Sequence, residues 1–282
     1  MNLVIAHKNC MDGLASAYIM SEYFKSINES YRIEFMQYGD IPPITQPDTD
    51  VYFVDFSLPK QQLLDLSKNV KSIKIFDHHK TAQEALDGIE LLASNISVVF
   101  DMNHSGAGIC SDRFNTDYKL VNQFIVICIE DRDLWNWKIK DSKAIGAYLN
   151  FKVEKNSINS FEEAIKTDVE SMIVIGNTLL EQQGKVVQEK IKNTRDITLL
   201  NHNIKAINTT ENISEIGNAI CLKYNTISLM YFITNDLKVV CSLRSIDALP
   251  SASGIATHFG GGGHRNACGF TIDIDKLKEI LN

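Results

Sequence analysis

The feature that most constrains the fold is an alternation, in the N-terminal half of the chain, between short apolar runs and segments with apolar residues at helical spacing. Such alternation is typical of βαβ units, in which neighbouring strands are parallel and helices cover the sheet. The runs and the helical segments after them are Leu3–Ala6 and Leu14–Phe24, Val51–Val54 and Gln61–Leu66, and Ile73–Phe76 and Ala82–Leu86. We therefore predict an α/β domain with a parallel sheet over residues 1–155.

The C-terminal part shows a second α/β pattern after a long helical stretch. Apolar residues recur at helical spacing from Asn159 to Asn193, interrupted by Gly176 and Gly184, which weaken a helix and permit bending. We expect a helical linker at residues 156–195 and a smaller α/β domain at 196–282. Its expected elements are a strand at Ile204–Ile207, a hairpin of Ile227–Thr234 and Leu237–Leu243, a short helix at Ser251–Phe259 and a strand at Ala267–Ile272.

Composition excludes several classes of protein. The chain has 282 residues, of which 44% are hydrophobic and 22% charged, values typical of globular proteins with room for two cores. Its apolar stretches are far shorter than the ~20 residues of a membrane span, and its first residues lack the pattern of a signal peptide. Six scattered cysteines without a C-x-x-C pair favour reduced thiols. We expect a cytoplasmic protein without membrane contact.

The charge balance limits the partners. The chain has 28 Lys and Arg against 35 Asp and Glu, a formal charge of −7. Proteins that hold long nucleic acids present basic surfaces, because phosphate neutralisation supplies most of their affinity. Binding of long duplexes is therefore not expected, whereas a local basic cleft for a small anionic ligand is compatible with the sequence.

Polar side chains follow the predicted N-terminal strands where each strand ends. Binding sites in open parallel sheets form outside the carboxyl ends of the strands, so these side chains are expected at one edge. They are His7, Asp55 and the run Asp77-His78-His79, joined by Asp12 at the start of the first helix and Asp131 after the apolar run Phe124–Ile129. Taken singly, Asp12 and Asp131 are more typical of helix caps, and His7 of a structural histidine.

Taken together, these side chains predict a metal site. Clustered carboxylates repel one another and raise each other's pKa values, a conflict that divalent cations remove. Mixed carboxylate and imidazole ligands suit Mn²⁺ best, with Mg²⁺, Fe²⁺ or Co²⁺ as alternatives. Two ions about 3.5–4 Å apart need a bridging carboxylate, and Asp55 is the candidate because it lies in the middle of the set.

A second cluster is rich in glycine. Glycines let backbone amides approach an anion closely, and an adjacent His-Arg pair adds donors suited to phosphate. A glycine run alone is typical of a flexible loop, but the His-Arg pair and the strand after it favour phosphate binding. The predicted binding residues are Gly261, Gly262, Gly263, His264 and Arg265. Arg244, which ends the run Val239–Leu243, either reaches the same anion or forms a surface ion pair.

With these motifs the chain resembles the DHH phosphoesterase superfamily, specifically RecJ-like and nanoRNase-like members with the first type of DHH-associated C-terminal domain. The resemblance covers almost the whole chain. Its motifs are His7-Lys8-Asn9-Cys10-Met11-Asp12-Gly13, Asp55 after a strand, Asp77-His78-His79, Glu130-Asp131-Arg132-Asp133-Leu134-Trp135, and Gly260 to His264. It implies an active site in a cleft between the two domains, bridged by the long helix.

The resemblance also implies roles for single residues. Asp55 would bridge two Mn²⁺ ions, and His7 would help to bind the first. The second ion would be completed by Asp12, His78 and Asp131. His79 would face the scissile phosphate, and the glycine run with His264 would hold the substrate.

The first motif departs from the usual family pattern, which has two Asp separated by one residue. Here Cys10 stands where the first Asp would fall, two residues before Asp12. Cys10 either ligates as a thiolate or leaves the first ion weakly held. Asp133, in the same acidic segment as Asp131, is an alternative ligand to it.

The predicted activity is metal-dependent hydrolysis of short 5′-phosphorylated oligonucleotides or dinucleotides, such as pGpG, to mononucleotides. The alternatives are a RecJ-like exonuclease on longer single strands, a phosphodiesterase for cyclic dinucleotides and, less favoured, a manganese-dependent pyrophosphatase. From a different class, a nucleotide sensor without catalysis fits the altered first motif. A homodimer through the long helix is compatible with the sequence.

Overall fold

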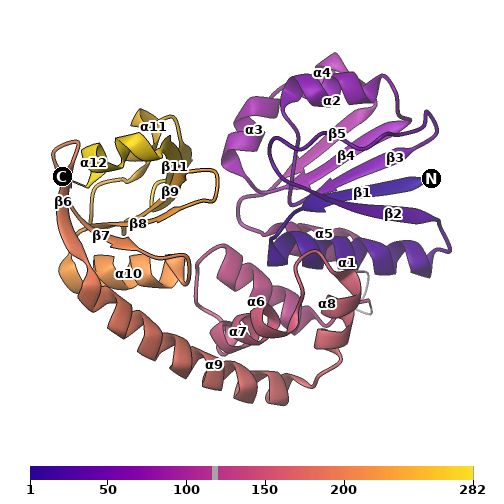
Figure 1. The fold of residues 1–282 in the computed structure, drawn as a ribbon. Coiled ribbons are helices and arrows are strands. Elements are labelled where there is room, and N and C mark those ends of the chain that lie inside the picture. The colour runs from indigo at the N-terminus through magenta and orange to yellow at the C-terminus, as the bar shows by residue number, and fades with distance from the viewer. Residues whose placement is uncertain (116–119, 282) are drawn as a thin grey trace. The chain divides into compact units, whose positions relative to one another are not determined.

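The structure is a computed structural model that describes residues 1–115 and 120–281. The chain forms two compact units, Met1–Leu180 and Glu181–Asn282, and the division falls within helix α9 (Val169–Lys190) (Figure 1). Within the described residues, no helix is long and apolar enough to cross a membrane.

A parallel sheet with the strand order β2-β1-β3-β4-β5 forms the centre of the first unit. Its strands are β1 (Asn2–His7), β2 (Tyr31–Met36), β3 (Asp50–Val54), β4 (Ser72–Asp77) and β5 (Ile96–Phe100). The three predicted strands are confirmed as β1, β3 and β4. The sequence analysis missed β2 and β5, which are edge strands and are only half-buried.

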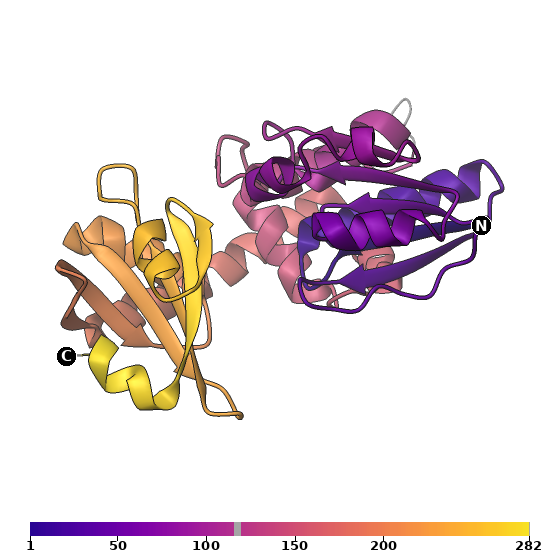
Figure 2. The ribbon, with the colours of Figure 1, turned by 90° about the horizontal axis from the view of Figure 1, so that it is seen from above.

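Helices cover both faces of this sheet (Figures 1 and 2). One face carries α2 (Lys60–Ser67), α3 (Lys80–Leu86) and α4 (Ile89–Leu92), and the other carries α1 (Met11–Ser26) and α5 (Gly106–Phe114). Alternate residues of one strand therefore enter different cores. In β1, Val4 and Ala6 pack with α1, whereas Leu3 and Ile5 pack with Leu63 of α2. Burial on both faces explains why every position of the run is apolar.

The apolar run Phe124–Ile129 is part of a helix. The chain after α5 forms α6 (Gln123–Asp133), α7 (Ser142–Lys152) and α8 (Ile158–Ile165), which add to the core on the α1 side. A short apolar run does not by itself distinguish a buried strand from a buried helix. This assignment decides which acidic side chain of the segment faces the site described below.

The second unit is built on a mixed sheet with the order β10-β11-β9-β8-β7-β6, in which only the pair β7 and β8 is parallel. The hairpin and the strands at residues 204–207 and 267–272 are confirmed, whereas β6, β10 and the helix α10 were not predicted. The elements are β6 (Arg195–Leu199), β7 (His202–Asn208), α10 (Ile213–Tyr224), β8 (Ile227–Ile233), β9 (Lys238–Arg244), α11 (Ser253–His258), β10 (Gly262–His264), β11 (Ala267–Asp273) and α12 (Leu277–Ile280).

The two glycines of α9 have different surroundings. Gly176 is buried, and a Cβ atom there would collide with the backbone carbonyl of Ala144 in α7. Gly184 is exposed, and a Cβ atom there would meet nothing within 4 Å. Gly176 is therefore needed for close helix packing, whereas no contact requires glycine at position 184.

We predict opposite effects of alanine at these two positions. Gly176→Ala should lower the free energy of unfolding by about 1–3 kcal/mol, since α9 has to move away from α7. Gly184→Ala should raise it by about 0.5–1 kcal/mol, because alanine loses less backbone freedom in a helix than glycine. Urea denaturation of both variants beside the parent chain measures this difference. Equal losses in the two variants would contradict the packing described for Gly176.

Candidate metal centre

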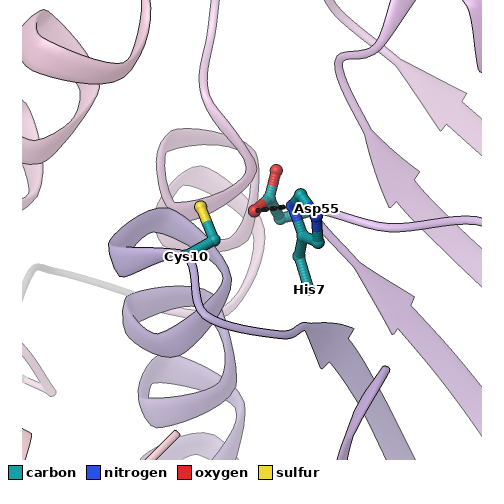
Figure 3. Close-up of side chains that lie close together, drawn as sticks. All are labelled: His7, Cys10 and Asp55. Carbon is teal, nitrogen blue, oxygen red and sulfur yellow. Dashed lines mark ion pairs between the residues drawn. The ribbon is translucent and has the colours of Figure 1, made fainter. Parts of the chain in front are cut away.

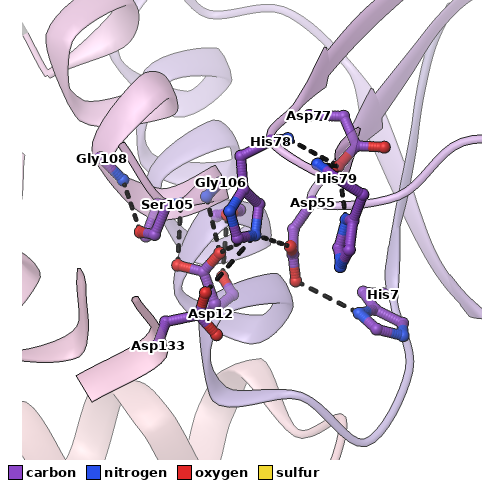
Figure 4. Close-up of polar contacts among 12 residues, drawn as sticks. His7, Asp12, Asp55, Asp77, His78, His79, Ser105, Gly106, Gly108 and Asp133 are labelled. Carbon is purple, nitrogen blue, oxygen red and sulfur yellow. Dashed lines mark hydrogen bonds and ion pairs between the residues drawn. The ribbon is translucent and has the colours of Figure 1, made fainter. Parts of the chain in front are cut away.

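The candidate site lies where the strand order of the first unit reverses. The chain leaves β1 toward β2 on one side and β3 toward β4 on the other, so the ends of β1 and β3 form the switch point at which such sheets bind ligands. His7 ends β1, Asp55 directly follows β3, and Asp77 ends β4. Figure 4 shows these side chains together with those of Asp12 and Asp133. The expectation that strand ends deliver polar groups to one edge is thus met.

Asp55 is the most constrained of these residues. Its side chain is 1% exposed and its φ angle of 53° lies in the left-handed region, which is uncommon outside glycine and is concentrated at functional sites. One oxygen lies 3.2 Å from Nε2 of His78, and the other lies 3.4 Å from Nδ1 of His7. The second contact lacks hydrogen-bond geometry, so Oδ2 is buried without a hydrogen-bond partner among the described residues.

The two histidines determine the charge of Asp55. Burial opposes its ionisation, but the contacts with His7 and His78 outweigh burial and keep the pKa of Asp55 well below its usual range. The reciprocal effect is seen at His78. Burial lowers its pKa, yet the contact with Asp55 and the charges of Asp12 and Asp133 raise the pKa of His78 to about 9.

Asp12 is placed by the N-terminus of α5. Its two oxygens accept hydrogen bonds from the amides of Gly106, at 2.6 Å, and Ala107, at 3.0 Å. These amides are unpaired within their helix, and the positive end of the helix dipole favours a carboxylate there. Burial is nevertheless the larger effect, and with the nearby Asp55 and Asp133 it raises the pKa of Asp12 well above its usual value.

Gly106 permits this close packing. A Cβ atom at this position would collide with the side chain of Asp55 and would lie 2.9 Å from an oxygen of Asp12. Only glycine therefore allows α5 to begin directly behind both carboxylates. Glu130 holds the preceding residue, because its carboxylate accepts a hydrogen bond from the amide of Ser105 at 3.0 Å.

Asp77 positions the two histidines that follow it. One of its oxygens accepts hydrogen bonds from the amides of His78, at 2.7 Å, and His79, at 3.2 Å, and lies 2.7 Å from Nδ1 of His79. Burial lowers the pKa of His79, but the contact with Asp77 outweighs it and leaves that pKa raised. With Nδ1 held by Asp77, the Nε2 end of the His79 ring is left for other contacts.

The potential ligands form three overlapping groups, in each of which the ligand atoms lie within 4.8 Å of one another. Asp55 belongs to two of these groups, and His78 also belongs to two. The groups are His7 with Cys10 and Asp55, Asp55 with His78 and His79, and Asp12 with His78 and Asp133. The shared, buried Asp55 with an oxygen that lacks a partner fits a pair of divalent cations, since an ion would satisfy that oxygen and offset the clustered carboxylates.

Among the predicted ligands, Asp131 is not in these groups, and Asp133 takes its place. Oδ2 of Asp133 lies 3.4 Å from Nε2 of His78, whereas the oxygens of Asp131 accept hydrogen bonds from the amide of Lys138 and the hydroxyl of Ser142. The reason is geometric. Both acids lie on helix α6, where residues two apart point in different directions, about 200° around the axis.

A cavity of about 330 Å³ adjoins the carboxylates. Its lining includes Cys10, Asp12 and Asp133 together with Arg132 and Trp135. Trp135 is 43% exposed. Arg132 forms no ion pair or side-chain hydrogen bond with a described residue, so its guanidinium is available to an anionic ligand.

Two predicted phosphate-binding residues of the second unit, Arg244 and His264, lie on strands on either side of β11. Arg244 of β9 is opposite Ala267 of β11, and Ala267 is opposite His264 of β10. Directly opposite residues share a face of the sheet, so Arg244 and His264 flank the small side chain of Ala267. Arg244 donates to the hydroxyl of Ser214 at 3.0 Å, and burial lowers the pKa of its guanidinium. Arg265 donates to the carbonyl of Leu249 at 2.9 Å.

The glycines beside His264 are not equivalent. At Gly261 a Cβ atom would collide with the carbonyl of Gly269, and Gly263 has a φ angle of 129°. At Gly262 a Cβ atom would meet nothing within 4 Å. The fold therefore accounts for glycine at positions 261 and 263 but not at 262.

Comparison with known proteins identifies the fold. An exopolyphosphatase-related protein from Bacteroides fragilis superposes with a TM-score of 0.60 at 14% identity, covering 95% of this chain and 86% of that one. The pGpG-specific phosphodiesterase PggH from Vibrio cholerae gives 0.54 at 13% identity over 99% and 95% of the two chains. RecJ from Thermus thermophilus with Mn²⁺ gives 0.55 at 12% identity, covering 99% of this chain and 50% of RecJ. The chain shares the fold of these three proteins, in agreement with the fold that the resemblance to the DHH superfamily implies.

Comparison of sequences identifies a relative of the chain. Protein R106 of Acanthamoeba polyphaga mimivirus, described as uncharacterized, is 30% identical over 303 aligned residues, which cover 96% of this chain and 68% of R106. The chain belongs to the same protein family as R106. No family model matches it.

We predict that the two acids of α6 respond differently to amidation. Asp133→Asn should weaken the binding of one divalent ion by at least about tenfold. Loss of a residue that only hydrogen-bonds to a metal ligand already lowers metal affinity by about this factor, and Asp133 is itself a proposed ligand. Asp131→Asn should keep both ions but lower the free energy of unfolding by about 1–3 kcal/mol, because the buried hydroxyl of Ser142 loses its charged acceptor. Calorimetric titration with Mn²⁺ and urea denaturation separate these effects. Loss of an ion in Asp131→Asn alone would contradict the assignment.

We predict that the metal-free protein loses stability as the pH rises from about 6.5 to about 9. His78 stabilises the fold fully at pH values below its unfolded pKa of 6.5, and this contribution is lost as the pH passes its folded pKa of about 9. The raised pKa of Asp12 acts in the same direction. Mn²⁺ should remove the loss, because it stabilises the deprotonated ligands. Thermal denaturation with a chelator and with Mn²⁺ tests this, and a metal-free Tm that rises over this range would contradict it.

Proposed function

We propose that the chain is a phosphodiesterase that uses two divalent metal ions, Mn²⁺ or alternatively Mg²⁺ or Co²⁺, to hydrolyse short 5′-phosphorylated oligonucleotides and dinucleotides to mononucleotides. One observation carries the proposal. On a DHH fold, a buried carboxylate, Asp55, is shared by two groups of potential ligands and has an oxygen without a hydrogen-bond partner among the described residues. The proposed ligands are His7, Cys10, Asp12, Asp55, His78 and Asp133, the last in place of Asp131.

The ions would supply an acidified water as nucleophile and positive charge opposite the phosphoryl oxygens. The residues of the chain add positioning and charge. Asp77 holds Nδ1 of His79, so the other end of the ring can donate to a phosphoryl oxygen, and the raised pKa of His79 favours the protonated form that does so. Asp55 and Asp12 are fixed by backbone contacts, which keeps the geometry of the centre set before the substrate binds.

The surroundings support a short substrate. The cavity beside Asp12 and Asp133 is about 330 Å³, at the lower end of the range for small-molecule sites. Arg132 offers a charge to a second phosphate there, and Trp135 offers a ring face to a base. In the second unit, we propose that Arg244, His264, Arg265 and the glycines at 261–263 bind another phosphate of the substrate. PggH is a phosphodiesterase and RecJ is an exonuclease, and both activities are of the proposed class.

We predict turnover of a 5′-phosphorylated dinucleotide in the presence of Mn²⁺. Asp55→Asn should reduce the turnover more than about 100-fold. Loss of a residue that only hydrogen-bonds to a metal ligand lowers activity by up to about 100-fold, and Asp55 is proposed to bind both ions directly. Release of mononucleotide by the parent chain and the variant measures this. A long single strand and a cyclic dinucleotide, assayed in parallel, test the alternative substrates. A variant that retains most of the activity would exclude the bridging role of Asp55.

We predict that Gly262→Ala raises KM without lowering stability. The fold has room for a Cβ atom there, so the added methyl group interferes only if a phosphate approaches the backbone amides. Steady-state kinetics with the dinucleotide, together with the Tm, test this. Gly184→Ala is the control, because its added methyl group is also unobstructed but lies on α9. An unchanged KM in Gly262→Ala would argue against phosphate binding by the glycine run.

A further inference from the structure

The two halves of the candidate metal centre offer different ligand atoms. We propose that the position formed by His7, Cys10 and Asp55 is a thiophilic site, which takes Zn²⁺, Fe²⁺ or Co²⁺ in preference to Mn²⁺ or Mg²⁺. The position formed by Asp12, His78 and Asp133, beside Oδ1 of Asp55, takes a hard ion, so that the centre holds two different metals with Asp55 shared between them. This inference rests on the proposed function for the presence of two ions, but it does not require turnover.

The geometry brings the sulfur to the site. Figure 3 shows His7, Cys10 and Asp55 converging from the end of β1, the N-terminus of α1 and the segment after β3. Their ligand atoms lie within 4.8 Å of one another. Cys10 is the N-cap residue of α1, and its side chain makes no capping hydrogen bond in the described structure. Burial and the nearby Asp55 and Asp12 raise the pKa of the Cys10 thiol, and the amide of Gly13 opposes this effect. A bound cation would favour the thiolate in the same way as it favours the other deprotonated ligands.

The loop that carries Cys10 is held in place. The amide of Asn9 donates to the side chain of Asn156 at 2.7 Å, and the side-chain amide of Asn156 donates back to that of Asn9 at 3.2 Å. At the other side, Gly13 lets the first turn of α1 approach His7, since a Cβ atom there would collide with the His7 carbonyl. Cys10 is thus fixed from both sides and does not rely on a bound ion for its position.

An independent observation, the environment of the Asp55 carboxylate, favours a cation at this point. Oδ2 of Asp55, the oxygen on the His7 side, is buried on a side chain that is 1% exposed and has no hydrogen-bond partner among the described residues. A buried carboxylate oxygen without a partner costs free energy. Nδ1 of His7 and Oδ2 of Asp55 lie 3.4 Å apart. A cation bound by these two atoms and by the sulfur of Cys10 would satisfy this oxygen.

The donor types determine the preferred ion. Cys, His and Asp supply sulfur, nitrogen and oxygen, and three such ligands with one open position are typical of catalytic zinc sites. Thiolates favour Zn²⁺ and related borderline ions, whereas Mn²⁺ and Mg²⁺ favour oxygen. The other position offers only carboxylate oxygens and an imidazole nitrogen. Cys10 therefore distinguishes two positions that would be alike if both were built from Asp and His.

Co²⁺ is a suitable probe, because a bound thiolate gives it a charge-transfer absorption in the near ultraviolet. We would titrate the whole chain with Co²⁺ and compare Cys10→Ser and Cys10→Asp with the parent. Cys268→Ser is the matched control, since Cys268 is a free thiol in the second unit and outside the groups of ligands. Circular dichroism verifies that each variant is folded. Competition between Zn²⁺ and Mn²⁺ is then measured on the parent and on Cys10→Asp.

The expected result is one thiolate–Co²⁺ band per chain in the parent and in Cys268→Ser, and none in Cys10→Ser or Cys10→Asp. Cys10→Asp should also lower the preference for Zn²⁺ over Mn²⁺ by about 10–100-fold. A folded parent that binds Co²⁺ without this band, a band that persists in both Cys10 variants, or no binding of Co²⁺ would overturn the inference. A band without hydrolysis of any nucleotide substrate would reject the proposed function and leave this inference standing.

Discussion

The burial of the Asp55 carboxylate is the constraint on which the rest of the first unit depends. A charge that is 1% exposed costs several kcal/mol unless it is paired, and the contacts with His7 and His78 satisfy only part of this requirement. The local backbone also adapts to the buried position of this carboxylate. Asp55 adopts a left-handed φ of 53°, and Gly106 lacks the side chain that would displace it. These local costs are explained if Asp55 holds cations.

The surrounding acids are not equivalent, because each has different partners. The pKa of Asp55 is lowered by two histidines, whereas burial and neighbouring charges raise the pKa values of Asp12 and Asp133. Without metal, the centre therefore carries less negative charge than its number of carboxylates suggests. Binding of divalent ions displaces the protons, so folding, protonation and metal affinity are linked in this unit.

Much of this arrangement could be predicted from the sequence. Runs such as Leu3–Ala6 are apolar at every position because both faces of the strand are buried. The polar residue after each run lies at the edge of the sheet where the strand ends. The choice between Asp131 and Asp133 could not be predicted in the same way. It depends on whether the preceding run is a strand or a helix, and residues two apart share a face only in a strand.

Other features depend on contacts between distant parts of the chain. The hydrogen bonds between Asn9 and Asn156, which hold the loop of Cys10, join residues 147 positions apart, and no local pattern indicates them. The collision that requires glycine at position 261 involves the neighbouring strand at Gly269 and becomes visible only when the pairing is known. The sequence alone shows a glycine run, whereas the structure separates the glycines that the fold requires from Gly262.

The central claim is that Asp55 is shared by two metal ions. Anomalous X-ray scattering from crystals soaked in Co²⁺, which suits both positions of the centre, tests it most directly, because it locates the ions without reference to activity. The account predicts two peaks about 3.5–4 Å apart on either side of the Asp55 carboxylate, one toward His7 and one toward Asp12. A single peak, or two peaks of which one does not contact Asp55, would contradict it.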